Sequence, residues 1–475
     1  MAFLERGANR GSVSTGFEID NSVKVEADND ERFTRTPSSA GNRKTWTFSA
    51  WVKRTELGAN QILISAADTY LYFGSDDKIH CNFRPASENF FLSTNRLFRD
   101  TSAFYHIVVQ CDTTDGTAAD RAKLYINGVR ETSYSSSTYN NMSQNLDTSM
   151  NNTIEHMIGR YSSSDDYRMS GYISEFHLVD GTALTPTSFG EFDEDSGIWK
   201  PKAYAGAYGT NGFYLDFKDS ANLGNDASGG TDFTETNITA ADQATDTPTN
   251  NFATLNVLNR NSATASNNPT YTEGNTRTTS TLDDYWQTAI ATIGVTSGKW
   301  YMEGQLIYDP AMAGIGVGDF GDIENWGRNN DNVMAGKAIG YGTPKAEVGD
   351  SLPASANDYT NSNIIGVALD ADNGKVYWSR DGTYQSSGDP VNGTNGISIP
   401  TGGDAEGLYM FGVSGYKATH GSYTGNVGWL VNFGGYTTIS ISSAATDANG
   451  YGTFEYAPPS GYYALCTKNL AQYGG

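Results

Sequence analysis

Apolar and polar residues alternate one by one in several short stretches of the first half of the chain. In the clearest stretch, 45–54, Trp46, Phe48, Ala50 and Val52 fall on one face of an extended strand, which is the period of a strand with one buried face. Similar runs predict further strands at 61–65, 70–73, 104–111, 123–130, 157–160 and 171–178. Long stretches of helical period are absent, so the pattern predicts an all-β fold with less than about 10% helix.

The second half of the chain shows the same alternation, most clearly at 363–384. Two strands are predicted there on either side of Asn373-Gly374, a dipeptide that favours a type I′ hairpin turn because both central residues take positive φ. Their apolar faces consist of Ile365, Val367, Leu369, Val376 and Trp378. Further strands are predicted at 298–303, 314–318, 429–434 and 454–462. The second half is therefore expected to be a second antiparallel β-sandwich.

With 475 residues, the chain is long enough for two or three domains. We expect one sandwich at 17–218 and another at 252–475. The segment between them, 219–251, consists mostly of Asp, Asn, Thr, Ser, Gly and Ala, a composition that leaves little to bury. It is predicted to be a polar linker that proteases cut first.

Residues 1–16 are polar and too few to form a core, so they are expected to be an arm. Phe3 and Leu4 are its large apolar residues, and we expect them to dock on a partner protein. The first six residues do not form the apolar core of a signal peptide, and no run of about 18 apolar residues could span a bilayer. Synthesis in the cytoplasm, without membrane insertion, is therefore expected.

The formal net charge is −23, from 31 Lys and Arg against 54 Asp and Glu. Nucleic acid is not an expected partner, because its phosphates are neutralised by Lys and Arg patches and no such patch is visible. Cys81, Cys111 and Cys466 have unrelated spacings, which predict neither a disulfide framework nor a zinc site. Small buried residues of a protein folded in a reducing cytosol account for them.

The order of strand motifs in the first half resembles the laminin-G-like jelly roll, a concanavalin A-like fold. The motifs are Trp46-Thr-Phe-Ser-Ala-Trp51, His106-Ile-Val-Val109, Lys123-Leu-Tyr-Ile-Asn-Gly128, Ile158-Gly-Arg160 and Gly171-Tyr-Ile-Ser-Glu-Phe176. Each is short, but they follow one another in the order that the family has, over residues 17–185. The second half, over residues 280–466, resembles the SPRY domain, another concanavalin A-like sandwich. This second resemblance implies a domain whose function is binding.

Three connecting segments are similar to virion proteins of tailed bacteriophages, particularly marine and cyanobacterial ones. They are Arg35–Trp46, Thr247–Asn256 and Ala457–Leu470. The resemblance implies a tail fibre, a tail-associated adhesin or a capsid appendage, located in the virion and made in the host cytoplasm. It favours a homotrimer bound to other virion proteins, although no coiled-coil heptads are present.

These observations favour a non-enzymatic virion protein that attaches to the host surface, with a glycan as the receptor. The first alternative is a capsid decoration or fibre-adaptor protein that binds only virion partners, and the second is a glycan hydrolase. Laminarinase-type hydrolases carry Glu-x-Asp-x-x-Glu on one strand face, with the catalytic carboxylates about 5–5.5 Å apart. Glu191-Phe-Asp-Glu-Asp195 ends in Asp and lies in a Gly/Ser/Asp-rich segment, so a solvated loop is predicted there.

Calcium is the one cofactor that the resemblance suggests. Laminin-G-like and pentraxin-type jelly rolls bind it through loop carboxylates and carbonyls, which suit a cation that takes six to eight oxygen ligands. Adjacent aspartates in loops are also common turn formers, and the five histidines form no metal-binding motif. The candidate calcium ligands are Asp76, Asp77, Asp165 and Asp166.

Aromatic residues between the strands of the second half are candidate ligand contacts, because aromatic faces suit sugar rings and protein anchors. Packing of the framework is the alternative role for each of them. If they contact the ligand, changing them to Ala should preserve folding and weaken binding to host cells. These candidates are Trp326, Tyr341, Tyr359, Tyr384 and Tyr416.

Overall fold

The computed structural model describes residues 16–85, 89–162, 164, 166–258, 268–280, 286–308, 312–319, 332–337, 360–399, 407–417 and 426–474. Strands make up 41% of the chain and helices 6%, which confirms the predicted all-β class. The chain forms two compact units, and the boundary between them lies between Thr249 and Asn250.

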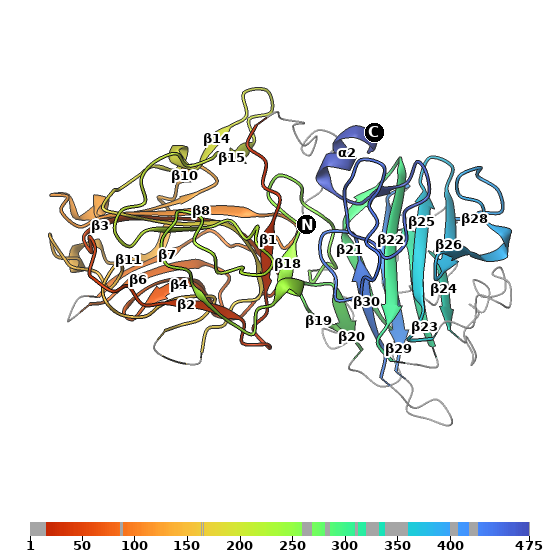
Figure 1. Ribbon diagram of the computed structural model, residues 1–475, viewed down its shortest axis with the longest axis horizontal. Coiled ribbons are helices and arrows are strands. Elements are labelled where there is room, and N and C mark those ends of the chain that lie inside the picture. The colour runs from red at the N-terminus through yellow and green to blue at the C-terminus, as the bar shows by residue number, and fades with distance from the viewer. Residues whose placement is uncertain are drawn as a thin grey trace. The chain divides into compact units, whose positions relative to one another are not determined.

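The first unit is a sandwich of two antiparallel sheets, drawn from red to green in Figure 1. Sheet A has the order β10 (Val129–Arg130), β9 (Ala122–Ile126), β8 (Tyr105–Asp112), β3 (Thr45–Arg54), β13 (Gly171–Asp180), β1 (Ser22–Val25) and β18 (Gln243–Ala244), and β16 (Phe213–Leu215) pairs with β13. Sheet B has the order β11 (Tyr134–Ser137), β7 (Phe90–Thr94), β6 (Ile79–Phe83), β5 (Thr69–Phe73), β4 (Gln61–Ala66), β12 (His156–Ile158), β2 (Arg32–Arg35) and β17 (Thr234–Thr236).

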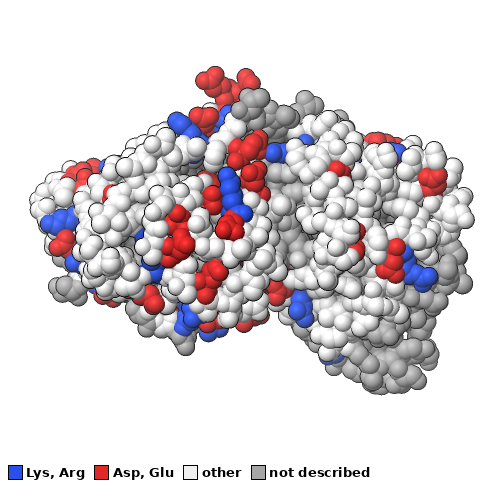
Figure 2. All heavy atoms as spheres, in the orientation of Figure 1, with Lys and Arg blue, Asp and Glu red and all other residues white. Residues whose placement is uncertain are grey.

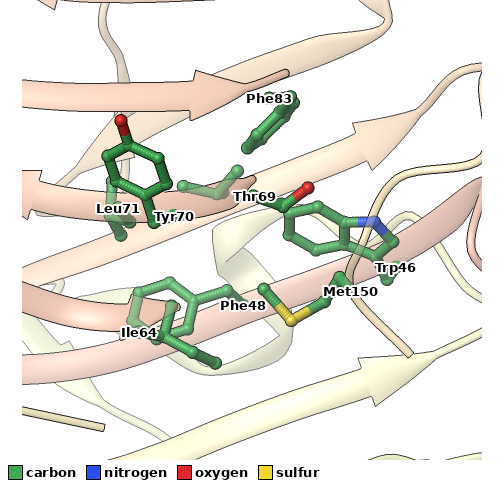
Figure 3. A pocket seen from close by; sticks show the side chains of 9 residues that line it. Trp46, Phe48, Ile64, Thr69, Tyr70, Leu71, Phe83 and Met150 are labelled. Atoms are coloured by element: carbon green, nitrogen blue, oxygen red, sulfur yellow. The ribbon is translucent and has the colours of Figure 1, made fainter. Parts of the chain in front are cut away.

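The inward-facing residues of both sheets fill the core of this unit. The Trp46 indole N–H donates a hydrogen bond to Thr148 Oγ1 at 3.0 Å, so the one polar atom of this buried ring has a partner. A cavity of about 10 Å³ remains, and Figure 3 shows Met150 between Trp46 and Phe48 in its apolar wall. That volume is at the lower limit for a single water molecule. This cavity is therefore too small for a ligand.

The chain after β13 returns over the outer face of sheet A. Its hairpin, β14 (Gly190–Phe192) and β15 (Trp199–Pro201), brings Trp199 onto His106, whose Nδ1 accepts from the indole N–H at 2.9 Å. Nearby, the His177 ring of β13 stacks on Tyr214 with 4.3 Å between ring centroids. The outer side chains of sheet A are thus covered by the chain's own later segments.

Residues 219–249 belong to the first unit, so the prediction of a linker is wrong. β17 pairs with β2, and β18 pairs with β1. The segment is polar on average, yet its few large apolar residues are buried, which no local pattern indicates. Those that enter the core are Leu223, Phe233 and Ile238.

Buried ion pairs fasten the end of this segment to sheet A. Lys53 Nζ lies 2.8 Å from Asp246 Oδ2, and both side chains are at most 1% exposed. Lys24 Nζ lies 2.9 Å from both Glu31 and Asp242. Because a buried charge without a counter-charge is very costly, these lysines require the segment to stay in place.

The two ends of the first unit lie next to each other. The Ile19 N–H donates to Thr249 Oγ1 at 3.1 Å, and the same hydroxyl donates back to the Ile19 carbonyl at 3.0 Å. The first and last strands of the unit, β1 and β18, are also direct neighbours. The chain therefore enters and leaves this unit side by side.

The second unit is also a sandwich of antiparallel sheets (Figure 1). The larger sheet has the order β19 (Thr270–Thr272), β20 (Arg277–Thr279), β30 (Gly428–Asn432), β22 (Lys299–Leu306), β25 (Ile364–Asp370), β26 (Lys375–Arg380) and β27 (Thr383–Tyr384), with β28 (Ile397–Ser398) on β26 and β31 (Tyr463–Ala464) parallel to β22. The smaller sheet has the order β21 (Trp286–Val295), β29 (Tyr409–Tyr416), β23 (Met312–Asp319) and β24 (Asn332–Lys337).

Helical segments are few and short among the described residues. They are α2 (Thr467–Tyr473) and the 3₁₀ turns η1 (Ala118–Asp120), η2 (Tyr139–Asn141), η3 (Pro186–Ser188), η4 (Ala240–Asp242) and η8 (Gln385–Ser387).

The predicted hairpin at 363–384 is present as β25 and β26, but its turn is longer than a type I′ turn. Asp370 pairs with Lys375, and Gly374 has φ +58° whereas Asn373 does not have positive φ. The Asp370 carboxylate instead accepts hydrogen bonds from the Asn373 N–H and amide.

A buried carboxylate holds the C-terminal segment against the larger sheet of the second unit. Glu303, on β22, is fully buried. It accepts hydrogen bonds from the Glu455 and Tyr456 N–H groups at 3.0 and 2.8 Å, and from the Asn432 amide at 3.1 Å. Burial raises the pKa of Glu303 to about 7, although these hydrogen bonds favour the charged form. This carboxylate is therefore a pH-sensitive contact.

We predict that D246A destabilises the first unit by about 3–5 kcal/mol, because it removes the carboxylate that lies 2.8 Å from the buried Lys53 ammonium. Urea unfolding of the full chain measures this change. D120A is the matched control, because Asp120 pairs with Arg130 at the surface, where ion pairs contribute little.

In limited proteolysis, residues 219–249 of the wild type should resist cleavage, and preferential cutting there would restore the linker hypothesis.

We also predict that the second unit loses stability as pH rises from about 4.5 to about 8. The folded state keeps the proton of Glu303 to a pKa of about 7, against 4.5 for an unperturbed glutamate. In that window the folded protein binds more protons, so the free energy of unfolding falls with pH, by on the order of 3 kcal/mol. Thermal unfolding of E303Q should show a shallower pH dependence, with E155Q, a change at an exposed glutamate, as control. An identical pH dependence in E303Q contradicts the assignment.

Candidate functional site

The aromatic residues predicted to contact a ligand fall in several different environments. Trp326, Tyr341 and Tyr359 lie outside the described residues. Tyr416 is the last residue of β29 and so lies within a strand, not between strands. Tyr384 is also in a strand, β27, where it is half-buried, and burial together with the Glu303 charge raises its pKa. Tyr384 therefore has the packing role that the sequence analysis gave as its alternative.

The predicted calcium ligands do not form a common site among the described residues. The Asp77 carboxylate is buried, lies 3.3 Å from Arg54 and 2.8 Å from Arg99, and accepts the Gly58 N–H. These contacts outweigh burial and hold the pKa of Asp77 below its usual value. Its oxygens are thus committed to an internal network.

The other aspartates leave the calcium hypothesis as a prediction. Asp76 is exposed and bonds to His80, and Asp166 is exposed in the loop after β12 and bonds to Ser164. Asp165 lies outside the described residues. No group of three or more His, Cys, Asp or Glu side chains with metal-binding geometry occurs in the described part of the chain.

Among the described residues, a cluster of aromatic rings, most of them half-exposed, lies on the outer face of sheet B. In β5 the buried residues are Leu71 and Phe73, so alternation turns Tyr70 and Tyr72 outward, where both are half-exposed. The two tyrosine rings lie 5.6 Å apart. Since strand residues are held by the ladder, these rings have a rigid support.

The neighbouring strands extend this surface. His80 of β6 stands opposite Tyr72 and stacks between it and Phe91 of β7, at 4.8 and 5.4 Å between centroids. Its Nε2 lies 2.9 Å from Asp76 Oδ1 at the end of the hairpin. Asn82 follows two residues later, opposite Tyr70 and Phe91. Polar groups therefore lie among the rings.

The loop after β12 adds two more tyrosines. Tyr161 lies 4.8 Å from Tyr70, and Tyr167 stacks on Tyr72 at 5.7 Å. The loop is fastened to β4, because Ser65 Oγ donates to the Arg160 carbonyl and accepts the Ser162 N–H, both at 2.9 Å. We call Tyr70, Tyr72, His80, Phe91, Tyr161 and Tyr167 together the tyrosine face.

The polar groups of the tyrosine face differ in their access to solvent. Tyr70, Tyr161 and Tyr167 are half-exposed, so solvent reaches this surface beside their rings. The Asn82 amide is fully buried, and neither its oxygen nor its nitrogen makes a hydrogen bond of good geometry, which is unusual for a buried amide. Burial raises the pKa of the Tyr72 phenol, and the nearby Asn82 amide opposes that rise. A ligand at this surface would therefore meet the tyrosine side chains and not the Asn82 amide.

Two groupings that could suit catalysis are engaged with other partners in the structure. Ser49 Oγ lies 2.9 Å from His106 Nε2, but the other ring nitrogen accepts the Trp199 indole N–H, where an orienting carboxylate would be required. Burial lowers the pKa of His106 to about 3. In the segment Glu191–Asp195, Asp193 forms a turn with Ser196 and pairs with Lys200 at 3.2 Å.

Across the described part of the chain, the model contains no helix with the length and apolar composition that a membrane span requires.

Comparison with known proteins supports the fold. A family model described as the concanavalin A-like lectin/glucanases superfamily matches residues 28–188, the region predicted to be a laminin-G-like jelly roll. No curated protein matches the sequence.

Several solved structures are similar at low sequence identity. The LG4-5 domains of mouse laminin alpha1 are 9% identical, with 88% of this chain and 90% of that chain covered and a TM-score of 0.29. The SPRY domain of human HERC1 is 12% identical, with 34% of this chain and 89% of that chain covered and a TM-score of 0.21. The IT-sialidase CBM40 of Ruminococcus gnavus is 12% identical, with 35% of this chain and 92% of that chain covered and a TM-score of 0.24.

We predict that N82L stabilises the first unit by about 1 kcal/mol, because it replaces a buried amide that lacks good hydrogen bonds with an apolar side chain of similar shape. N432L is the matched control, since the equally buried Asn432 amide donates to Glu303 and to the Thr453 carbonyl. That control should lose about 2–3 kcal/mol. Urea unfolding compares the two variants, and equal losses would show that Asn82 is fully satisfied.

Proposed function

We propose that this chain is a non-enzymatic virion protein, of the tail-fibre or adhesin type, that attaches to the host surface by binding a glycan on its tyrosine face. The observation that carries this proposal is the cluster of rings on the outer face of sheet B, where Tyr70, Tyr72, Phe91, Tyr161 and Tyr167 are half-exposed. The concanavalin A-like lectin/glucanase fold of the first unit is in keeping with it.

The chemistry of the tyrosine face suits a sugar. A pyranose ring presents C–H groups on its faces and hydroxyls around its edge, and tyrosine combines an aromatic ring with a hydroxyl that donates and accepts. Tyrosine also contributes a large contact area at a low cost in conformational entropy. Tyr72 and Tyr167, stacked at 5.7 Å, would contact C–H groups through their exposed parts, while their hydroxyls would bond to the sugar edge.

The remaining parts of the proposal come from resemblance to phage virion proteins. They are a location in the virion after synthesis in the host cytoplasm, attachment to other virion proteins through Phe3 and Leu4, and assembly as a homotrimer. Calcium at the Asp76 or Asp166 loop belongs to the proposal as an optional ligand. The alternative role, capsid decoration or fibre adaptation, would use the surface for virion partners and not for the host.

The experiment compares Y161A/Y167A with wild type in binding to host cells and to arrayed host glycans. Both changes lie in a surface loop, so folding should be preserved, and binding should weaken at least about tenfold if the rings are central contacts. Y204A is the matched control, because Tyr204 is also half-exposed but packs on Phe189 in the segment that covers sheet A.

Unchanged host binding by Y161A/Y167A, together with defective particle assembly, would assign the protein to the structural class. Cleavage of host polysaccharide by the wild type would reject the non-enzymatic assignment and favour the hydrolase.

A further inference from the structure

Two carboxylates contact one buried lysine in the first unit. Figure 2 shows basic side chains at the surface, where water surrounds their charge, whereas the Lys24 side chain on β1 is only 1% exposed. Its Nζ lies 2.9 Å from Glu31 Oε1 and 2.9 Å from Asp242 Oδ1. Glu31 directly precedes β2, and Asp242 directly precedes β18, the last strand of the unit. The site thus brings one amine and two acids together from the two ends of the unit.

Hydrogen bonds fix the orientation of the Asp242 carboxylate. Its Oδ1 faces Lys24, whereas its Oδ2 accepts the Thr239 N–H at 2.8 Å and the Thr239 hydroxyl at 3.1 Å. Donors placed in this way polarise the carboxyl group and stabilise negative charge that develops on Oδ2. The Asp242 carboxyl carbon is therefore prepared for attack by a nucleophile.

Glu31 is placed to carry a proton at this site. Its Oε2 accepts the Glu26 N–H at 2.8 Å, and its Oε1 accepts the Asn29 amide at 3.0 Å, so the carboxyl group is held beside Lys24 Nζ. Burial raises the pKa of Glu31 to about 7, although Lys24 favours its charged form. A carboxyl group with such a pKa takes up and releases protons at neutral pH. An ion pair with Lys24 needs one carboxylate, and the second supplies this further capacity.

We propose that Lys24 and Asp242 condense into an amide, so that an isopeptide bond joins the first strand of the unit to its last segment. Glu31 takes a proton from the Lys24 ammonium, and the lone pair of the amine attacks Asp242 Cγ and forms the N–C bond. The bond between Cγ and Oδ1 breaks. Oδ1 leaves as water with two protons of the ammonium, one of them by way of Glu31, which ends with the charge that it had at the start. No oxidant, reductant or other reactant is consumed.

The folded unit favours this condensation in two ways. The neutral amide replaces two charges that are costly to keep out of water. The pairing of β1 with β18 holds the reacting groups in contact, which gives them a high effective concentration. Folding therefore supplies the conditions under which an amine and a carboxylate can join.

The bond would change how the first unit carries force. Ile19 and Thr249, where the chain enters and leaves the unit, lie outside the segment from Lys24 to Asp242. A pull on these two ends would pass through the covalent bond and leave the sheets between them unloaded. This inference does not depend on the proposed function, since it concerns the chain's own chemistry and not its ligand.

The test is the intact mass of the purified full chain under denaturing conditions. The wild type should be lighter by one water molecule than the mass calculated from its sequence, with the N-terminus identified in the same digest. Trypsin should release residues 11–32 joined to residues 219–260, because it does not cleave after an acylated Lys24. K24R and E31Q should have their full calculated masses. E303Q changes a buried glutamate of the second unit whose pKa is also raised to about 7, so it is the matched control and should keep the loss of water.

A wild type with the full calculated mass overturns the inference, and so does a loss of water that the peptides place elsewhere in the chain. A loss that persists in E31Q overturns the role of Glu31 as the proton carrier. If circular dichroism shows that E31Q has lost its sheets, the wild-type mass and the joined peptides decide the question instead.

Discussion

Buried charged groups determine which faces of the sheets are covered by later segments of the chain. Lys53 has no exposed atom and depends on Asp246, so the end of the first unit must lie on sheet A. Glu303 in the second unit depends in the same way on the N–H groups of Glu455 and Tyr456. In each unit a late segment of the chain supplies the partner. Within the described part of the chain, no strand covers the outer face of sheet B over β5 to β7, and Tyr70, Tyr72 and Phe91 stay half-exposed there.

The alternation of apolar residues was sufficient to predict the long strands β3, β8 and β13, because a strand with one buried face has period two whatever its partner is. It did not predict β6, β7, β21 or β29. The strand predicted at 454–462 is wrong, because Phe454 forms only an isolated bridge and β31 begins at Tyr463. Nor was alternation sufficient for residues 219–249. Leu223, Phe233 and Ile238 are too far apart to give a period, and β17, which follows Phe233, pairs with β2 about two hundred residues earlier. The turn after Asp370 was mispredicted for a related reason, since a side-chain hydrogen bond to Asn373 competes with the backbone preference of Asn-Gly.

The tyrosine face could have been predicted in part. Tyr70 and Tyr72 occupy the outward positions of a strand whose other residues are apolar, and aromatic residues at both such positions are a signal. The same signal occurs at His177 and Tyr214, which are stacked under a covering segment of sheet A. Alternation separates inward from outward residues but does not say which outer face is covered. The nearness of Tyr161 and Tyr167 depends on the loop's hydrogen bonds to β4, and no sequence period encodes that.

The hydrogen bonds between Ile19 and Thr249 have a consequence for how such a protein can change over time. A module whose entry and exit points touch can be removed from a longer chain, or inserted into another, without stretching the flanking polypeptide. Exchange of the whole first unit between proteins would therefore transfer the tyrosine face and its covering segment together. Recombination at these two points is a route to a different outer surface in a single event, with the rest of the chain unaltered.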